Sequence, residues 1–229
     1  MAKPEGDCGD NHVKLFVECD RYPTKTMQVT QQRYYTPEEY LELEEAADYK
    51  SEYIDGHIIP MAHESVNHNL IGGNFAAALN FAFKKLDYEV FIFQLRLWIP
   101  QKQIYTYPDV MIVAGKVECY KNRTDVILNP QVIIEVLSKS TKAYDRDDKF
   151  EAYRSIPTFQ EYLLIDQNRI YVEQYSKTGK KQWALREYDE EDEAIALVTL
   201  PFNISLQDLY NKVQFELVES EAESVDIEG

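Results

Sequence analysis

Two short apolar segments of the sequence each contain one carboxylate. Asp109 follows Pro108 and opens the segment at residues 109–113, and Glu135 lies inside the segment at residues 132–137. Both segments are typical of buried β-strands, because they are otherwise runs of apolar and mostly branched residues. An isolated carboxylate on a core strand is costly to desolvate. Two such groups on neighbouring strands repel each other unless a cation lies between them, and a divalent metal ion is the simplest such cation.

Glu52 and Lys149 could complete such a site. A hard cation such as Mg²⁺ takes oxygen ligands, so two or three carboxylates from separate strands can hold it while water and phosphate complete its shell. The bound metal lowers the pKa of a water ligand and stabilises charge on a transferring phosphate, and a nearby lysine adds electrostatic help. These four residues therefore predict metal-dependent phosphodiester hydrolysis.

Local signals predict the elements before the first of these strands. The string Thr36-Pro37-Glu38-Glu39 combines an N-cap, a first-turn proline and a capping box, which predicts a helix over residues 36–49. Asp55-Gly56, flanked by β-forming residues, predicts a hairpin over residues 51–59. Glu52 lies on the incoming strand of this hairpin.

The remaining pattern predicts a mixed α/β (α+β) fold. The helix predicted between the strand that carries Glu135 and the next one suits a crossover between neighbouring strands. Gly72-Gly73 lowers the helix propensity of its segment, so we expect another backbone to approach there. The predicted elements are a helix at 66–86, strands at 89–99, 109–113 and 132–137, a helix at 141–154, strands at 161–165 and 170–174, a last hairpin of 183–188 with 194–200, and a short helix at 205–212.

The composition predicts one soluble, cytoplasmic domain. The chain has 229 residues, of which 45% are hydrophobic and 13% aromatic, enough for one packed core. Residues 1–30 lack periodicity and predict a loose extension, residues 31–215 the folded domain, and residues 216–229 an acidic tail. The three cysteines form no Cys-x-x-Cys pair, which argues against a disulfide framework or a zinc site. We find no signal-peptide core and no membrane-length apolar run.

The net charge of −16 argues against nucleic acid as a partner, because phosphate binding usually requires a basic surface. The charge is unevenly distributed, however. Residues 186–229 carry 13 acidic and 2 basic residues, whereas residues 101–185 carry 11 acidic and 13 basic residues. The acidic excess therefore lies away from the strands that carry Asp109 and Glu135, which weakens the objection without removing it.

Several strings together resemble the PD-(D/E)XK nuclease superfamily and, within it, the Uma-type restriction endonuclease family, over roughly residues 34–212. Each string is short, but their order and spacing are specific, with Glu135 placed 26 residues after Asp109. The strings are Tyr35-Thr36-Pro37-Glu38-Glu39-Tyr40, Glu52-Tyr53-Ile54-Asp55-Gly56, His68, Tyr107-Pro108-Asp109-Val110, Ile134-Glu135-Val136-Leu137-Ser138, Asp145 with Lys149 and Tyr153, and Glu161-Tyr162.

The resemblance implies a restriction-endonuclease-like core with flanking helices and an added C-terminal hairpin. It implies Mg²⁺, or Mn²⁺ as a substitute, held by Asp109, Glu135 and Glu52, with DNA as substrate and a homodimer as the assembly. The sequence departs from the superfamily pattern at Leu137, where the general motif has lysine. In the Uma-type family a lysine on the next helix takes that role, which here is Lys149, with Lys139 as a competitor. The resemblance also implies supporting roles for His68, Asp145 and Tyr153.

Each of these residues also has a simpler interpretation. Asp109 after a proline could cap a strand or turn, and Glu52 could be a solvated cross-strand charge. Asp145 and Lys149 at i, i+4, with Tyr153 one turn further, could form an ordinary surface pair with a packed tyrosine. Glu135 in an apolar strand has no such simple alternative.

Two other functions compete with a nuclease. A catalytically inactive nucleic-acid-binding or protein-interaction module would retain the fold, and the acidic composition favours it. A glycosidase with paired carboxylates is a weaker alternative, because the sequence shows no aromatic sugar platform.

Overall fold

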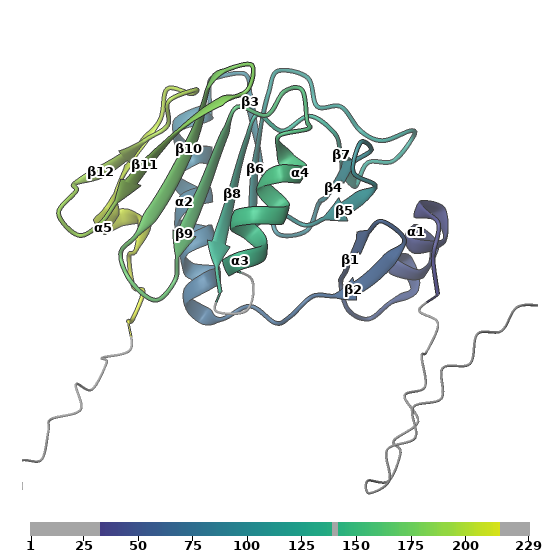
Figure 1. Cartoon of the computed structure of the whole chain (residues 1–229). Coiled ribbons are helices and arrows are strands. Elements are labelled where there is room, and N and C mark those ends of the chain that lie inside the picture. The colour runs from purple at the N-terminus through teal and green to yellow at the C-terminus, as the bar shows by residue number, and fades with distance from the viewer. Residues whose placement is uncertain (1–32, 139–141, 216–229) are drawn as a thin grey trace, which may run out of the picture. The chain divides into compact units, whose positions relative to one another are not determined.

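The structure is a computed structural model that describes residues 33–138 and 142–215. Its largest element is a six-stranded mixed sheet (Figure 1). Only β8 and β9 run parallel, and every other neighbouring pair in this sheet is antiparallel. The strands, in spatial order, are β11 (Gln182–Tyr188), β10 (Val172–Gly179), β9 (Glu161–Asp166), β8 (Val132–Leu137), β6 (Val110–Ala114) and β3 (Tyr88–Ile92).

Helices cover both faces of this sheet because its central strands are apolar on both sides (Figure 1). Helix α2 (Val66–Phe83) packs Phe75 and Leu79 on one face, against alternate residues such as Ile134. The opposite face carries the crossover from β8 to β9, which consists of α3 (Lys142–Tyr144), the π-helical turn η1 (Asp145–Lys149) and α4 (Phe150–Tyr153). The predicted crossover helix is confirmed, although the π-helical turn interrupts it and residues 139–141 lie outside the described residues.

A second sheet of five strands carries the predicted hairpin. Its order is β2 (His57–Pro60), β1 (Ser51–Ile54), β5 (Ile104–Thr106), β4 (Arg96–Ile99) and β7 (Val126–Ile127). Helix α1 (Pro37–Ala46) has the predicted capping box, and its Tyr40 stacks on Tyr105. Asp55 and Gly56 form the predicted turn with φ values of 42° and 85°. The hairpin places Glu52 on β1, as the sequence predicts.

Two strand predictions are wrong. The strand predicted at residues 89–99 is two strands in different sheets, because Phe93, with a φ of 47°, ends β3 before β4 begins. Residues 183–188 and 194–200 also do not pair with each other. Strand β11 pairs with β10, whereas β12 (Ala194–Ala196) pairs with β13 (Asn203–Ser205), which leads into α5 (Leu206–Leu209). After β12 the backbone N–H groups of Val198 and Thr199 donate hydrogen bonds to the buried carboxylate of Glu161, so these residues do not continue the strand.

The prediction for the paired glycines is also corrected. A Cβ on Gly72 would lie 2.5 Å from the ring of Phe93, so a side chain and not a backbone makes the close approach. A Cβ on Gly73 would meet nothing within 4 Å.

The predicted extension at residues 1–30 and tail at residues 216–229 lie outside the described residues. Within the described ranges, the structure has no helix with the length and apolarity needed to span a membrane.

Candidate active site

The residues that the sequence predicts for the site line one cavity of about 410 Å³. It lies between the β1–β2 hairpin, the N-terminus of α2, the ends of β6 and β8, and η1. Tyr153 contacts the cavity residue Glu135 from α4. The competing Lys139 lies outside the described residues. The cavity residues predicted from the sequence are Glu52, His68, Asp109, Glu135, Asp145 and Lys149.

The pairing of β6 with β8 sets Asp109 and Glu135 side by side. Val110 lies opposite Ile134 in this antiparallel pair, so Asp109 reaches the level of Glu135. The backbone N–H of Val136 donates to Asp109 Oδ2 over 2.7 Å, and the backbone N–H of Asp109 approaches Glu135 Oε2 at 3.4 Å. Each carboxylate is thus held by the backbone of the other strand. This geometry fixes both groups at the cavity wall, and the interpretation of Asp109 as an isolated turn cap does not account for it.

Lys149 is buried among carboxylates from three elements. Its Nζ lies 3.2 Å from Glu135, 3.0 Å from Asp145 and 3.6 Å from Glu52. Burial by itself lowers the pKa of this lysine, but the surrounding carboxylates raise it well above its usual value. Lys149 therefore stays a cation, and the interpretation of Lys149 and Asp145 as a surface pair is excluded by their burial.

The charges of the cavity are not balanced by this one lysine. The carboxylates of Glu52, Asp109, Glu135 and Asp145 line the cavity together with Lys149 and His68. Burial raises the pKa of Glu135, which is 3% exposed, to about 8, although Lys149 lowers it. Repulsion from Asp109 and Asp145 contributes to the raised pKa. Added positive charge would therefore stabilise the ionised form of this cluster.

Glu52 lies on the lysine side of the cavity. Thr106 of β5 donates a hydrogen bond to Glu52 Oε1, and Lys149 contacts the same oxygen. Glu52 is buried, so the interpretation as a solvated cross-strand charge is not supported. Tyr153 similarly donates a hydrogen bond of 2.6 Å to Glu135 Oε1 from the far side. Both contacts orient a carboxylate toward the cavity.

His68 lies beside Asp109 at the N-terminus of α2. Ser65 caps this helix by accepting a hydrogen bond from the backbone N–H of His68. Nε2 of His68 lies 3.1 Å from Asp109 Oδ2, and Nδ1 lies 3.6 Å from Glu64 Oε2. Burial lowers the pKa of His68, but the hydrogen bond with Asp109 and the negative charges of Asp109, Glu64 and Glu135 together raise it above its usual value. The structure thus brings this predicted supporting residue into contact with Asp109.

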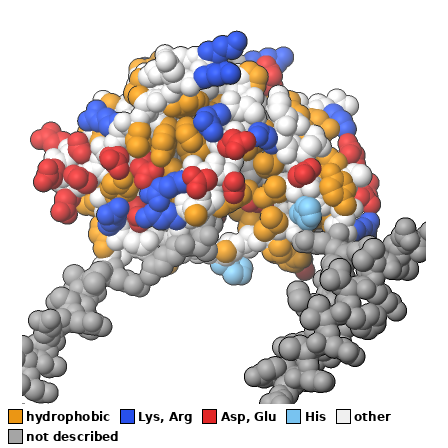
Figure 2. Space-filling model, in the orientation of Figure 1, with side chains coloured by type: hydrophobic (Ala, Val, Ile, Leu, Met, Phe, Trp, Pro, Cys, Tyr) orange, Lys and Arg blue, Asp and Glu red, His pale blue; other side chains and the backbone are white. Residues whose placement is uncertain are grey.

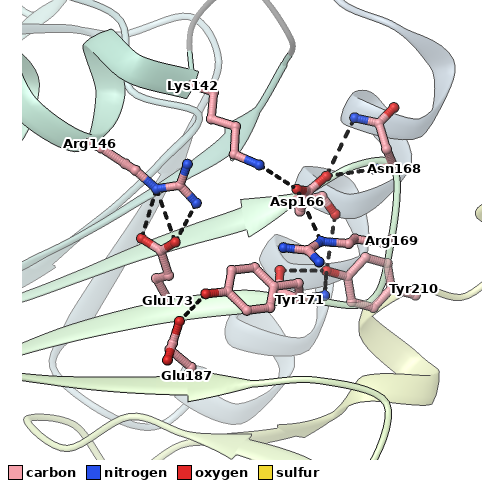
Figure 3. A network of polar contacts seen from close by, with 9 residues as sticks. All are labelled: Lys142, Arg146, Asp166, Asn168, Arg169, Tyr171, Glu173, Glu187 and Tyr210. Carbon is pink, nitrogen blue, oxygen red and sulfur yellow. Dashed lines mark hydrogen bonds and ion pairs between the residues drawn. The ribbon is translucent and has the colours of Figure 1, made fainter.

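A network of ion pairs beside the cavity holds the crossover segment in place (Figure 3). Arg146 makes a forked ion pair with Glu173 of β10, with its Nε 3.0 Å from each carboxylate oxygen. Lys142 contacts Asp166 at the end of β9 over 3.2 Å. These contacts anchor α3 and η1 on the sheet, and with them the lysine of the cavity.

Sequence reasoning did not single out every residue of the cavity wall. Tyr144 and Gln167 line it, and Gln167 accepts a hydrogen bond from the α2 cap residue Ser65. Tyr144 directly precedes Asp145 in the sequence, so it could have been named together with Asp145. Gln167 follows β9, and only the tertiary structure brings it beside α2. The two tyrosines before Asp109 are buried: Tyr105 lies in β5, and Tyr107, which follows this strand, donates to Glu44 over 2.8 Å.

A comparison with known protein families identifies the family of this chain. The Uma2 family model, described as "Putative restriction endonuclease", matches residues 37–208. The chain belongs to the Uma2 family. This membership confirms the family resemblance predicted from the sequence.

Two proteins of Synechocystis sp. (strain PCC 6803) are related to this Uma2 family member. The uncharacterized protein sll1609 is 45% identical over 152 residues, covering 66% of this chain and 86% of that protein. The uncharacterized protein slr1290 is 32% identical over 180 residues, covering 79% and 93%. A crystal structure of a "putative nuclease belonging to DUF820" from Anabaena variabilis has a TM-score of 0.63 at 22% identity, covering 76% of this chain and 97% of that one. That similarity confirms the predicted mixed α+β nuclease fold.

Proposed function

We propose that this Uma2 protein is a metal-dependent endonuclease that hydrolyses phosphodiester bonds in DNA. The observation that carries the proposal is a pair of carboxylates, Asp109 directly before β6 and Glu135 on β8, each held by the backbone of the other segment. They share a cavity with a lysine that neighbouring carboxylates keep positively charged. Membership of the Uma2 family supports the nuclease class. The metal and the DNA substrate are part of the proposal.

The donor set of the cavity fits a divalent cation. Asp109 and Glu135 offer carboxylate oxygens from adjacent strands, and Glu52 offers a third carboxylate from the hairpin. Hard cations such as Mg²⁺ and Mn²⁺ prefer such oxygen ligands. When bound, the cation would lower the pKa of a water ligand and neutralise charge on the phosphate.

The residues of the chain have distinct roles in the proposed reaction. Lys149 stays protonated, so it offers positive charge to a phosphoryl oxygen and does not act as a base. Tyr153 holds Glu135 in its orientation through the hydrogen bond to Oε1. Arg146 acts further out, because its ion pair with Glu173 fixes the segment that carries Lys149. The substrate would enter the cavity with its scissile phosphate between Lys149 and the carboxylate pair.

A cleavage assay tests this function. Wild-type protein and Glu135→Ala are incubated with plasmid DNA and single-stranded DNA, in Mg²⁺ or Mn²⁺ and in EDTA. We expect metal-dependent cleavage that is lost in Glu135→Ala. Glu89→Ala removes an exposed strand carboxylate on β3 and should cleave like the wild type. Cleavage that survives Glu135→Ala would contradict the proposed site.

A catalytically inactive binding module is the second candidate. The acidic composition favours it, and Figure 2 shows basic side chains interspersed with acidic ones over the visible face, with acids gathered near the β11–β12 edge. This candidate predicts no divalent-dependent cleavage under any condition. It also predicts that Asp109→Ala leaves the affinity for nucleic acid unchanged.

We also propose that two copies associate through the outer face of α2. This helix of 18 residues contains no Asp, Glu, Lys or Arg, although the chain is strongly acidic. Its Val66 and Phe81 are 77% and 86% exposed. An uncharged face lowers the local repulsion where two like-charged molecules meet. In a two-fold dimer the same face serves both copies. Light scattering at micromolar concentration should show a dimer, and a monodisperse monomer would contradict this proposal.

A further inference from the structure

His68 has the surroundings of a metal-binding histidine. Its ring is buried, and its two nitrogens face different carboxylates. Nε2 faces Asp109 at 3.1 Å, and Nδ1 faces Glu64 at 3.6 Å. Among the described residues, Nδ1 has no hydrogen-bond partner although it is fully buried. Buried polar atoms are nearly always hydrogen-bonded, so this nitrogen requires an explanation.

The position of Glu64 supplies that explanation. A histidine that binds a metal through one ring nitrogen usually directs its other N–H to a carboxylate, which fixes the tautomer and the ring orientation. Glu64 lies four residues before His68 and at the Nδ1 side of its ring. A small movement of this partly exposed carboxylate would complete the hydrogen bond and leave the Nε2 lone pair for a cation.

The distance on the other side of the ring fits two ligands of one ion. Adjacent ligands that each lie about 2.1 Å from an octahedral ion are separated by about 3 Å. His68 Nε2 and Asp109 Oδ2 are 3.1 Å apart. Donor atoms of Glu64, His68 and Asp109 also all lie within 4.8 Å of one another. The spacing is therefore compatible with a shared cation.

The cavity has two chemically different sides. Lys149 forms its ion pairs with Glu52, Glu135 and Asp145. Asp109 instead contacts His68 and the backbone of β8. Lys149 already supplies positive charge to Glu52, Glu135 and Asp145. A bound cation is therefore stabilised most beside Asp109, which has no lysine partner among the described residues.

We infer that the cation of the proposed function binds between Asp109 and His68 and takes Nε2 of His68 as a direct ligand. This inference rests on the proposed function and specifies its metal. Imidazole suits later transition ions best, Mn²⁺ prefers oxygen ligands but also accepts an imidazole beside them, and Mg²⁺ favours an all-oxygen shell. The site therefore favours a transition ion such as Mn²⁺ over Mg²⁺.

Mn²⁺ binding to the full-length protein without nucleic acid tests the inference. Pulsed electron paramagnetic resonance should show a ¹⁴N coupling from a directly bound imidazole in the wild type. This signal should be lost in His68→Gln, with Mn²⁺ affinity weakened at least about tenfold, the effect typical of disturbing a metal-binding histidine. His57→Gln alters a histidine of β2 that does not line the cavity, and should match the wild type.

The result separates this inference from the proposed function. Bound Mn²⁺ without ¹⁴N coupling in the wild type would overturn the inference, even if Glu135-dependent cleavage is observed. Unchanged Mn²⁺ affinity in His68→Gln would do the same. Nitrogen-coupled Mn²⁺ in a protein that cleaves no DNA would support the metal site and contradict the proposed nuclease activity. Because the coupling is measured in the wild type, the test does not depend on how well a variant folds.

Discussion

Two polar regions lie at neighbouring strand ends of the large sheet, and they differ in how their buried carboxylates are neutralised. In the network of Figure 3, the two buried acidic groups have cationic partners of their own: Glu173 has Arg146, and Asp166 has Lys142 and Arg169. In the cavity, the carboxylates of Glu52, Asp109, Glu135 and Asp145 are grouped around Lys149 and His68.

The pKa values of two glutamates express the same difference. Burial tends to raise the pKa of Glu173, but the ion pair with Arg146 lowers it below its usual value. Burial raises the pKa of Glu135 even though Lys149 is close, and neighbouring carboxylates add to the shift. The network is therefore electrostatically complete, whereas the cavity has an excess of negative charge. Groups with pKa values perturbed in this way are typical of functional sites.

Removing the central lysine should have the largest effect on stability. Lys149→Met leaves buried carboxylates without their cation, and breaking such a buried pair costs about 3–5 kcal/mol. Urea unfolding at pH 7 measures this change in the free energy of unfolding. Lys142→Met in the network is the matched control, because its side chain is 39% exposed and a surface ion pair contributes less than about 1 kcal/mol. Equal losses for the two variants would remove the distinction between the regions.

Neutralising an acid of the network should destabilise the protein by less. Glu173→Gln loses the charge that pairs with Arg146, and hydrogen bonds to charged groups contribute about 1.5–3 kcal/mol. Since the folded state lowers the pKa of Glu173, its ionised form stabilises the protein above the unfolded pKa of 4.5, and this stabilisation is lost as the pH falls through the folded value. The difference from the wild type should therefore shrink below pH 4.5. A stability difference between the variant and the wild type that grows below pH 4.5 would contradict the pairing of Glu173 with Arg146.

Neutralising an acid of the cavity should change the free energy of unfolding least, and it should not destabilise the protein. Glu52→Gln keeps an oxygen that can accept the hydrogen bond of Thr106, and Lys149 retains two other carboxylates. The variant also reduces repulsion, so in EDTA we expect a gain between zero and about 1 kcal/mol. Thermal unfolding beside Glu173→Gln provides the comparison. A loss of stability as large as that of Glu173→Gln would show that the charges of the cavity are balanced, which would contradict the account.

Local signals predicted the elements that depend on neighbouring residues only. The Thr36 cap and the Asp55-Gly56 turn form as expected, because their conformations are determined within four residues. The break at Phe93 was missed, because no Gly or Pro marks it. The pairing of β12 with β13 was missed because the segment after β12 is held by a tertiary contact with Glu161, which lies more than thirty residues earlier in the sequence.

In the candidate site, too, the sequence predicted local features and missed those that depend on tertiary packing. Asp109 and Glu135 could be recognised as carboxylates in apolar segments, and their strands are indeed adjacent. The spacing shows that Asp145 can pair with Lys149, but the contacts of Lys149 with Glu52 and Glu135 and the contact of His68 with Asp109 could not be derived from it. They depend on how α2 and η1 pack against the sheet.

The central claim is that the excess negative charge of the cavity forms a divalent cation site. Anomalous diffraction from crystals of the protein soaked in Mn²⁺ tests it most directly. The account predicts a peak inside the cavity, about 2.2 Å from a carboxylate oxygen of Asp109. A cavity without a peak, in crystals whose surface sites do bind Mn²⁺, would contradict it.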